Sequence, residues 1–242
     1  MAQKGQLLYE GKAKKLYETD SPEVLWVEYC DQATAFNGEK KDQIPGKGKL
    51  NNQISGMIFD LLADAGVPSH YLGSLSETEH LAQKVQIIPL EVVVRNVAAG
   101  SLCKRLGLME GTALPDPIVE LFYKDDDLGD PLITDEHVKI LNLASEAEVA
   151  EIKEKALTVN AALTEIFEKC GIRLVDFKLE FGRDAEGNVL LADEVSPDTC
   201  RLWDAATDEH LDKDVYRRDI GDLTSVYQVV LARLQELTAK RG

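Results

Sequence analysis

Three charged residues alternate along an apolar segment in the C-terminal third of the chain. Asp176, Lys178 and Glu180 occupy every second position, so their side chains would share one face of a strand. The residues between them are apolar and would form the core face of that strand. Two carboxylates beside an ammonium group are suited to binding a phosphorylated ligand together with its cation.

A turn follows this strand, and its register decides which acidic residues meet. Residues 184–188 are rich in Asp, Gly and Asn and lead into a second apolar run. A turn centred on Glu186 and Gly187 places Glu180 directly opposite Asp193. Facing carboxylates repel each other, and oxygen ligands of this kind suit magnesium bound to substrate phosphates. The spacing alone leaves two interpretations open, namely a magnesium site and a solvated hairpin face.

Lysines near the N-terminus form a second candidate site. Glu10, Lys12 and Lys14 would share one face of a strand, with Gly11 allowing a ligand to approach the backbone. Ammonium groups on alternate residues suit a polyphosphate, although exposed lysines are more often simply solvated. A basic loop at residues 47–49 either closes over ligands or is mobile.

A third candidate site lies where an apolar strand leads into a helix. Ser101 is expected to be the N-cap of that helix, whose free N–H groups would attract an anion. Arg95, six residues earlier, offers a planar fork for a phosphate or carboxylate. The alternative is an ordinary N-cap without a ligand.

A proline-containing turn places two further charged residues near the hairpin. The turn at residues 196–199 directs Asp198 and Arg201 towards Asp193. The competing interpretation is a structural turn held by an Asp198–Arg201 ion pair.

The elements that must position these residues indicate an α+β fold. Segments 7–17 and 24–29 predict a hairpin, and segment 87–95 predicts a buried strand. Helices are expected from about residue 54 to Gly66, from Ser145 to Gly171, and over residues 223–239. We therefore expect two lobes, a β-rich lobe at residues 1–86 and a larger mixed lobe at residues 87–242, with ligands in the cleft between them.

Composition limits the class of protein. The chain has 242 residues and a formal net charge of −16, which argues against general binding to nucleic acid or to an anionic membrane. No segment reaches the length and apolarity of a membrane span or a signal peptide. The four cysteines are widely spaced, as in a cytoplasmic protein with reduced thiols.

Together these segments resemble the phosphoribosylaminoimidazole-succinocarboxamide synthase family, also called SAICAR synthetase. The similarity runs in order across almost the whole chain, and every charged position of the pattern is present. The segments that carry it are residues 9–14 (YEGKAK), 91–101 (EVVVRNVAAGS), 174–182 (LVDFKLEFG), 193–198 (DEVSPD) and 201–204 (RLWD).

The resemblance implies a function. The family is an ATP- and magnesium-dependent ligase of purine biosynthesis that joins L-aspartate to a carboxylated aminoimidazole ribotide, releasing ADP and phosphate. It also implies a two-lobed fold with an ATP site arranged as in kinases and ATP-grasp enzymes, a cytoplasmic location and a possible homodimer. The implied roles are ATP binding by Lys12, Lys14, Lys84, Glu91 and Glu180, metal binding by Glu180 and Asp193, catalysis by Asp176 and Lys178, and ribotide binding by Arg95, Ser101, Asp198 and Arg201.

Two other functions use the same residues. A small-molecule kinase would release a stable phosphorylated product without needing an amine. An inactive nucleotide-binding module would be expected to lack Lys12, Glu180 or Asp193, and the chain has all three.

Overall fold

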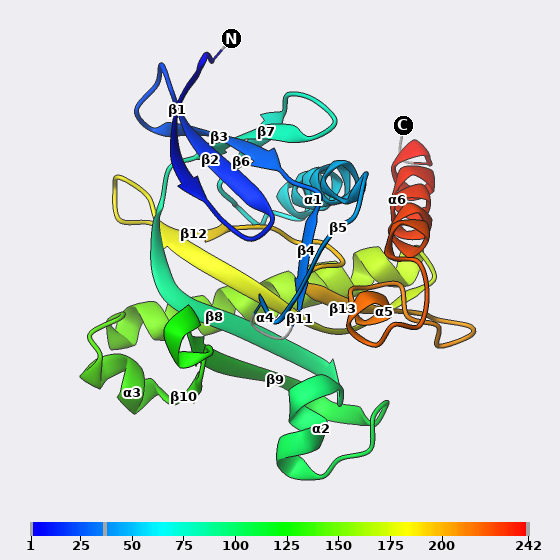
Figure 1. Ribbon diagram of the computed structural model, residues 1–242. Coiled ribbons are helices and arrows are strands. Elements are labelled where there is room, and N and C mark those ends of the chain that lie inside the picture. The colour runs from blue at the N-terminus through cyan, green and yellow to red at the C-terminus, as the bar shows by residue number, and fades with distance from the viewer. Residues whose placement is uncertain (1, 36–37, 241–242) are drawn as a thin grey trace.

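Antiparallel pairing between strands builds both of the main sheets. The structure is a computed structural model that describes residues 2–35 and 38–240, and Figure 1 shows how its elements are arranged. A five-stranded sheet has the order β1-β2-β3-β7-β6. Its strands are β1 (Lys4–Glu10), β2 (Lys14–Thr19), β3 (Val24–Tyr29), β6 (Tyr71–Ser74) and β7 (Glu79–Gln83).

A six-stranded sheet is built from strands that begin at residue 86 or later. Its order is β10-β9-β8-β11-β12, and β13 pairs with β11 beyond the end of β12. The central strands β8 and β11 lie side by side, and most of the apolar residues of each are buried. The strands are β8 (Gln86–Val97), β9 (Ala113–Tyr123), β10 (Leu132–Ile133), β11 (Ile172–Arg183), β12 (Val189–Ala192) and β13 (Cys200–Asp204).

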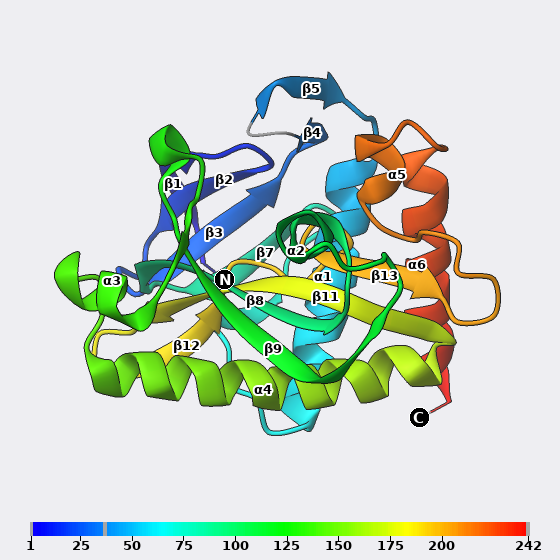
Figure 2. The same cartoon turned by 90° about the horizontal axis from the view of Figure 1, so that it is seen from below.

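Helices cover the large sheet and fill the space beside it. Figure 2 shows α4 lying along the large sheet, with α1 and α6 packed against each other to one side. A separate two-stranded sheet consists of β4 (Gln32–Ala35) and β5 (Lys40–Gln43). The helices are α1 (Lys47–Asp64), α2 (Gly100–Leu106), α3 (Asp135–Ile140), α4 (Glu146–Lys169), α5 (Asp214–Arg217) and α6 (Leu223–Ala239), with a 3-10 turn at Asp126–Leu128.

One apolar core joins elements from both halves of the sequence. Ile54 and Ile58 of α1 are fully buried in the same cluster as Val92 of β8 and Phe177 of β11. The change from one sheet to the other falls between Gln83 and Gln86, but α1 packs with the later elements. The division into lobes at residues 1–86 and 87–242 therefore stays a prediction, and its outermost residues 1, 241 and 242 lie outside the described part of the chain.

Two long helices and the central strand agree with the sequence analysis. α4 has the expected capping box, in which Ser145 Oγ accepts a hydrogen bond from the Glu148 N–H and the Glu148 carboxylate accepts one from the Ser145 N–H. α6 begins after Asp222, whose carboxylate caps the helix. The buried strand expected at residues 87–95 is present as the longer β8.

The prediction of one continuous strand at residues 7–17 is wrong, and the difference affects the site. A tight turn at residues 11–13 divides it into β1 and β2, and the Gly11 N–H donates to the Lys14 carbonyl at 2.8 Å. Lys12 lies in this turn, so Glu10, Lys12 and Lys14 do not share one strand face.

The basic loop expected at residues 47–49 is the first turn of α1. The Asp31 carboxylate accepts hydrogen bonds from the N–H groups of Gly46 and Gly48, at 3.0 and 2.9 Å, and so caps the helix start. The cap comes from a residue distant in sequence, so the local pattern gave no sign of it. Among the described residues, no helix is long and apolar enough to cross a membrane.

Candidate active site

A single large cleft brings together residues of both sheets. Its volume is about 810 Å³, and its walls include the β1–β2 turn, the β8–β11 face and the segment after β12. Most of the residues singled out from the sequence line it. They are Lys12, Lys14, Glu91, Arg95, Asp176, Lys178, Glu180, Asp193, Asp198 and Arg201.

Two of the expected site residues lie outside the lining of this cleft. Lys84 instead borders a separate cavity of about 220 Å³, beside the turn between β2 and β3. Ser101 is not an N-cap, because α2 begins at Gly100 with Ala99 in the cap position. Its hydroxyl accepts hydrogen bonds from Arg95 and Arg105 at 3.2 and 3.1 Å.

The hairpin that carries Glu180 has a register one residue away from the predicted one. Glu180 pairs with Ala192, and Asp193 lies just beyond the last pair. Asp193 has a φ of 59°, which turns the chain out of β12. The two carboxylates still share a partner, because the Lys178 ammonium donates to Glu180 at 2.5 Å and to Asp193 at 3.3 Å.

The solvated alternative for this hairpin is also excluded by the structure. Glu180 is only 4% exposed, and its carboxylate also accepts a hydrogen bond from Lys124 at 2.8 Å. Lys14, from β2, forms ion pairs with Asp193 and with Glu194, the latter at 3.3 Å. These contacts tie the small sheet to the hairpin through charged groups.

At the end of the cleft that carries Lys14, Lys178 and Asp193, attraction between opposite charges outweighs the unfavourable effect of burial on each charged group. Burial disfavours the ammonium of Lys14, but Asp193 and Glu194 more than offset it, so the pKa of Lys14 lies well above its usual value. The pKa of Lys178 is raised for the same reason, by Glu180 and Asp193. Burial opposes the charge on Asp193, yet Lys14 and Lys178 hold its pKa far below the usual range. Each of these groups is therefore charged at neutral pH.

Guanidinium groups dominate the other end of the cleft. The Asp176 carboxylate accepts hydrogen bonds from Arg95 at 2.7 Å and from Arg201 at 2.9 Å. Arg95 also donates to Glu120 at 2.7 Å and is only 3% exposed, so its fork is not free. To bind an anion, Arg95 would have to exchange one of these partners for the ligand.

Asp198 is fixed from three sides instead of pairing with Arg201. Its carboxylate accepts hydrogen bonds from the Lys47 ammonium at 2.6 Å and from the Tyr227 hydroxyl at 2.5 Å, with Lys213 at 3.6 Å. Burial opposes its charge, but Lys213 and Lys47 hold the pKa of Asp198 well below its usual value. The turn held by an Asp198–Arg201 pair is therefore wrong, because Arg201 binds Asp176 and Asp214.

Several residues in or beside the cleft were missed by the sequence analysis. Lys47 is fully buried at the start of α1, where the sequence analysis expected a loop that closes over ligands or is mobile. Lys124 and His70 come from segments without a recognisable motif, and only the fold brings them to the hairpin. Glu194 follows Asp193 directly in the sequence, but the sequence analysis assigned it no role, and its pair with Lys14 comes from the fold.

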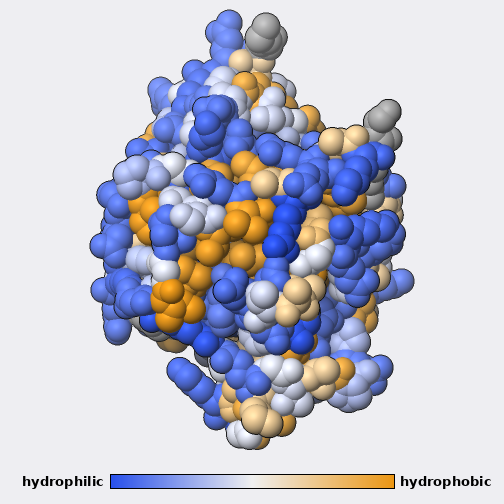
Figure 3. All heavy atoms as spheres, turned by 90° about the vertical axis from the view of Figure 1, so that its right-hand side faces the viewer, coloured by the Kyte–Doolittle hydropathy of each residue, from blue (hydrophilic) through white to orange (hydrophobic). Residues whose placement is uncertain are grey.

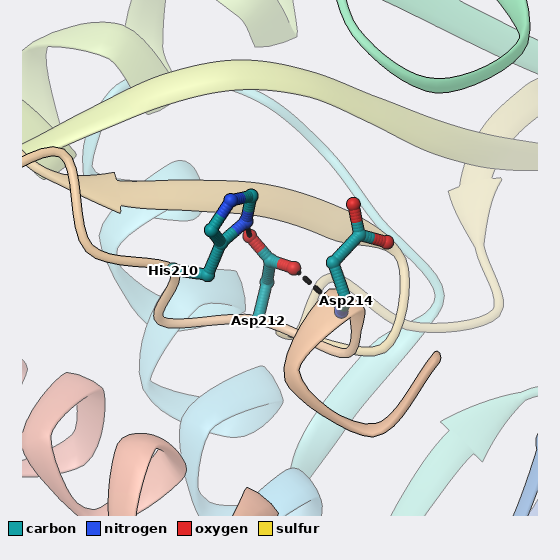
Figure 4. Close-up of side chains that lie close together, drawn as sticks. All are labelled: His210, Asp212 and Asp214. Atoms are coloured by element: carbon teal, nitrogen blue, oxygen red, sulfur yellow. Dashed lines mark hydrogen bonds and ion pairs between the residues drawn. The ribbon is translucent and has the colours of Figure 1, made fainter. Parts of the chain in front are cut away.

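A compact group of three side chains lies next to the end of the cleft that carries Arg201. It consists of His210, Asp212 and Asp214 (Figure 4). Asp212 accepts hydrogen bonds from the N–H groups of Leu202 and Asp214, at 2.8 and 2.7 Å. Asp214 is paired with Arg201 at 2.9 Å, and also with Arg217 and Arg218. Because guanidinium groups already surround Asp214, a metal ion would be repelled, and the group serves to hold α5 against β13.

Comparison with known proteins agrees with this geometry. The sequence model of the SAICAR synthetase family matches residues 7–234. The chain belongs to this family. A phosphoribosylaminoimidazole-succinocarboxamide synthase from Lysinibacillus sphaericus is 64% identical over 96% of this chain and 98% of its own length.

Solved structures of the family have the same fold. The synthase from Ehrlichia chaffeensis is 42% identical, covers 95% of this chain and 98% of its own, and superposes with a TM-score of 0.93. A SAICAR synthetase in complex with ADP is 51% identical, covers 95% of this chain and 97% of its own, and gives a TM-score of 0.91. The family and function expected from the sequence are confirmed: the chain is an ATP-dependent ligase of purine biosynthesis.

Proposed function

We propose that the cleft holds ATP, magnesium and the ribotide together and joins L-aspartate to the ribotide in two steps. In the first step, an oxygen of the ribotide carboxylate attacks the γ-phosphorus of ATP, forming an acyl phosphate and releasing ADP. In the second step, the amine of aspartate attacks the acyl carbon, loses a proton and expels phosphate. One observation carries this proposal: a single cleft has Lys14, Lys178, Glu180 and Asp193 at one end and Arg95 and Arg201 at the other. We call these the lysine–carboxylate end and the arginine end.

The lysine–carboxylate end is the better place for ATP. Lys12 lies in a turn and is half-exposed, with Asp126 as its partner at 2.6 Å, so it can move to a phosphate at little cost. Lys14 faces the same space from β2 of the small sheet, and Glu91 lines the cleft from β8 of the large sheet. A related SAICAR synthetase whose structure was solved in complex with ADP supports nucleotide binding by this chain. An ATP site between two sheets, as in kinases and ATP-grasp enzymes, belongs to this proposal.

The carboxylates of Glu180 and Asp193 fit magnesium. They are oxygen donors held near each other by one ammonium group, that of Lys178. Magnesium in nucleotide sites commonly uses one or two carboxylates together with substrate phosphates. The ion would supply positive charge that offsets the charge of the phosphates, and the ammonium groups of Lys14 and Lys178 would add their own.

Lys178 is the candidate for stabilising the transferred phosphoryl group. It lies between the two ends of the cleft, and its pKa keeps it charged. Phosphoryl transfer depends mainly on positioning and on electrostatic stabilisation of spread negative charge. Asp176, on the same strand face, would hold the two arginines at the spacing that the ribotide requires.

The arginine end is assigned to the ribotide. Arg95 and Arg201 offer guanidinium groups for its anionic groups, and Asp198 offers a carboxylate for hydroxyl or amine hydrogens. Ser101 would take part through Arg95, to which its hydroxyl is bound.

A cytoplasmic location and a homodimer complete the proposal. Figure 3 shows the side on which α5 and α6 lie, where apolar residues gather in a band between hydrophilic regions. Ile220 and Val229, in this part of the chain, are 57% and 38% exposed. Such a surface could be covered by a second copy.

The test of the proposed function is the dependence of phosphate release on each substrate. Purified protein is mixed with ATP, magnesium and the carboxylated ribotide, with or without L-aspartate. We expect steady phosphate release only with aspartate present, and the succinocarboxamide in equal amount. Steady ATP turnover that ignores aspartate and yields a stable phosphorylated ribotide would instead indicate the kinase.

A further inference from the structure

His70 lies against the proposed magnesium site but has no role in the chemistry described so far. The backbone of His70 connects the two sheets. The His70 N–H donates to the Leu191 carbonyl of β12 at 2.8 Å, and the Gln83 N–H of β7 donates to the His70 carbonyl at 2.6 Å. The residue is 8% exposed and borders the main cleft. His70 is thus fixed at the junction beneath the hairpin that carries Asp193.

The imidazole ring of His70 contacts the main chain of Asp193. The distance from Nε2 to the Asp193 carbonyl oxygen is 3.1 Å. A carbonyl oxygen only accepts hydrogen bonds, so Nε2 must carry the hydrogen and donate it. The ring itself is held by Phe59, whose centroid lies 5.7 Å away in an edge-to-face arrangement. The donor atom therefore has little freedom to turn away from Asp193.

Asp193 needs such support because of its backbone conformation. Its φ of 59° lies in the left-handed region, which is unfavourable for a residue other than glycine and persists only where the surroundings enforce it. This conformation turns the chain at the end of β12, and the side chain then reaches Lys14 and Lys178. A small rotation of the peptide would move the carboxylate away from both lysines.

We propose that His70 is a positioning residue, which holds the Asp193 peptide in its left-handed conformation and thereby directs the carboxylate at the magnesium ion. The inference rests on the proposed function, in which Asp193 binds that ion. In this role His70 acts through the main chain of Asp193 and needs no contact of its own with the ion or the substrates.

The test compares ADP binding with and without magnesium. His70→Phe keeps an aromatic ring of similar size but removes the donor, whereas His70→Gln places an amide nitrogen close to the position of Nε2. Calorimetric titration with ADP is carried out in magnesium and again in EDTA. We expect His70→Phe to weaken ADP binding about tenfold in magnesium, as for groups that orient metal ligands, and to leave binding in EDTA within about twofold. His70→Gln should restore most of the magnesium-dependent affinity.

Two further variants separate this inference from the proposed function. His80→Phe alters another buried histidine, which binds Asn52 and not Asp193, and should leave the magnesium dependence unchanged. Asp193→Asn should abolish it. If Asp193→Asn has no effect, the metal role of Asp193 is wrong and the inference is overturned with it. If Asp193→Asn acts but His70→Phe behaves like His80→Phe, the inference alone is overturned.

A measurement on the unmodified protein keeps the inference testable if a variant fails to fold. Nitrogen-15 NMR of the labelled protein identifies which ring nitrogen of His70 carries hydrogen. The geometry requires hydrogen on Nε2, in the free protein and in the complex with magnesium and ADP. A bare Nε2 in either state would overturn the proposed contact.

Discussion

Lys178 explains how buried carboxylates on one hairpin can lie close together. Its ammonium lies within 3.5 Å of carboxylate oxygens of Glu91, Glu180 and Asp193, and its own burial is offset by their charges. The same arrangement is suited to catalysis, because a cation that is already held in place needs no reorganisation when phosphate charge develops. At the scale of single residues, the account depends on Glu180 and Arg95, one from each end of the cleft.

Replacing Glu180 tests the magnesium site. Glu180→Gln keeps the size of the side chain but removes the charge that would attract the ion. We expect the magnesium concentration for half-maximal rate to rise about tenfold or more, since metal sites lose affinity on this scale when their ligand geometry or charge is disturbed. Glu186→Gln, an exposed substitution in the hairpin turn, is the matched control. An unchanged magnesium requirement in Glu180→Gln would contradict the assignment.

Replacing Arg95 tests the ribotide end. Arg95→Ala removes a charged hydrogen-bond donor, which corresponds to roughly tenfold or more in affinity, so the KM for the ribotide should rise by that factor. The KM for ATP should stay near normal. Arg233→Ala, which breaks an ion pair with Asp204 outside the cleft lining, serves as control in the same steady-state assay. Equal losses for ribotide and ATP would show that the two substrates are placed wrongly.

At the scale of elements, local patterns predicted what local forces determine. The capping box of α4, the extent of α6 and the apolar run of β8 are all visible in short stretches of sequence. The start of α1 was not visible, because its cap is Asp31, sixteen residues before the first helical residue. The turn at Lys12 was not visible either, because it depends on a backbone hydrogen bond inside a segment expected to be one strand. The one-residue error at Asp193 has a similar cause, since the left-handed φ of that residue reflects its tertiary surroundings.

The site shows the same limit. The motifs identified most of the charged residues that share the cleft. This was possible because β8 and β11 pair directly and carry Arg95 and Asp176 opposite each other. Partners supplied by other elements were not found. Lys47 and Lys124 reach Asp198 and Glu180 only after the helices and loops have packed.

The contact between α5 and β13 predicts an acid sensitivity. Burial opposes the charge of Asp214, but Arg201 and Arg217 lower its pKa from 3.8 to about 2. A carboxylate whose pKa is lower in the folded state stabilises the fold above its unfolded pKa, and this stabilisation is lost as the pH falls from about 4 to about 2. It should amount to roughly 2 kcal/mol at neutral pH.

Urea unfolding of Asp214→Asn at several pH values checks this prediction. At pH 7 the variant should be less stable by about 2 kcal/mol, because Arg201 and Arg217, which are only partly buried, lose the charge of their shared carboxylate. This deficit should shrink as the pH falls towards 2. Asp208→Asn, which changes a mostly exposed pair with Arg173, should be near neutral throughout. A deficit that is constant with pH would contradict the role of charge.

At the scale of the whole molecule, the lysines and arginines of the cleft balance its carboxylates locally, although the chain as a whole has a net charge of −16. The substrates are anions, so binding depends on these local groups and not on the overall field. The two sheets supply different parts: the small sheet brings Lys14, and the large sheet brings Lys178 and Arg95. Because both ends open into one cavity, the terminal phosphate of ATP and the ribotide carboxylate can meet.

Transfer of oxygen from the ribotide to phosphate tests this meeting most directly. The ribotide is prepared with both carboxylate oxygens labelled with oxygen-18, and the reaction is run with ATP, magnesium and L-aspartate. Attack of the carboxylate on the γ-phosphorus predicts one labelled oxygen in each phosphate released and one left in the new amide. Mass spectrometry of the phosphate would show this directly. Phosphate without the label would contradict an acyl phosphate intermediate, and with it the central claim about this cleft.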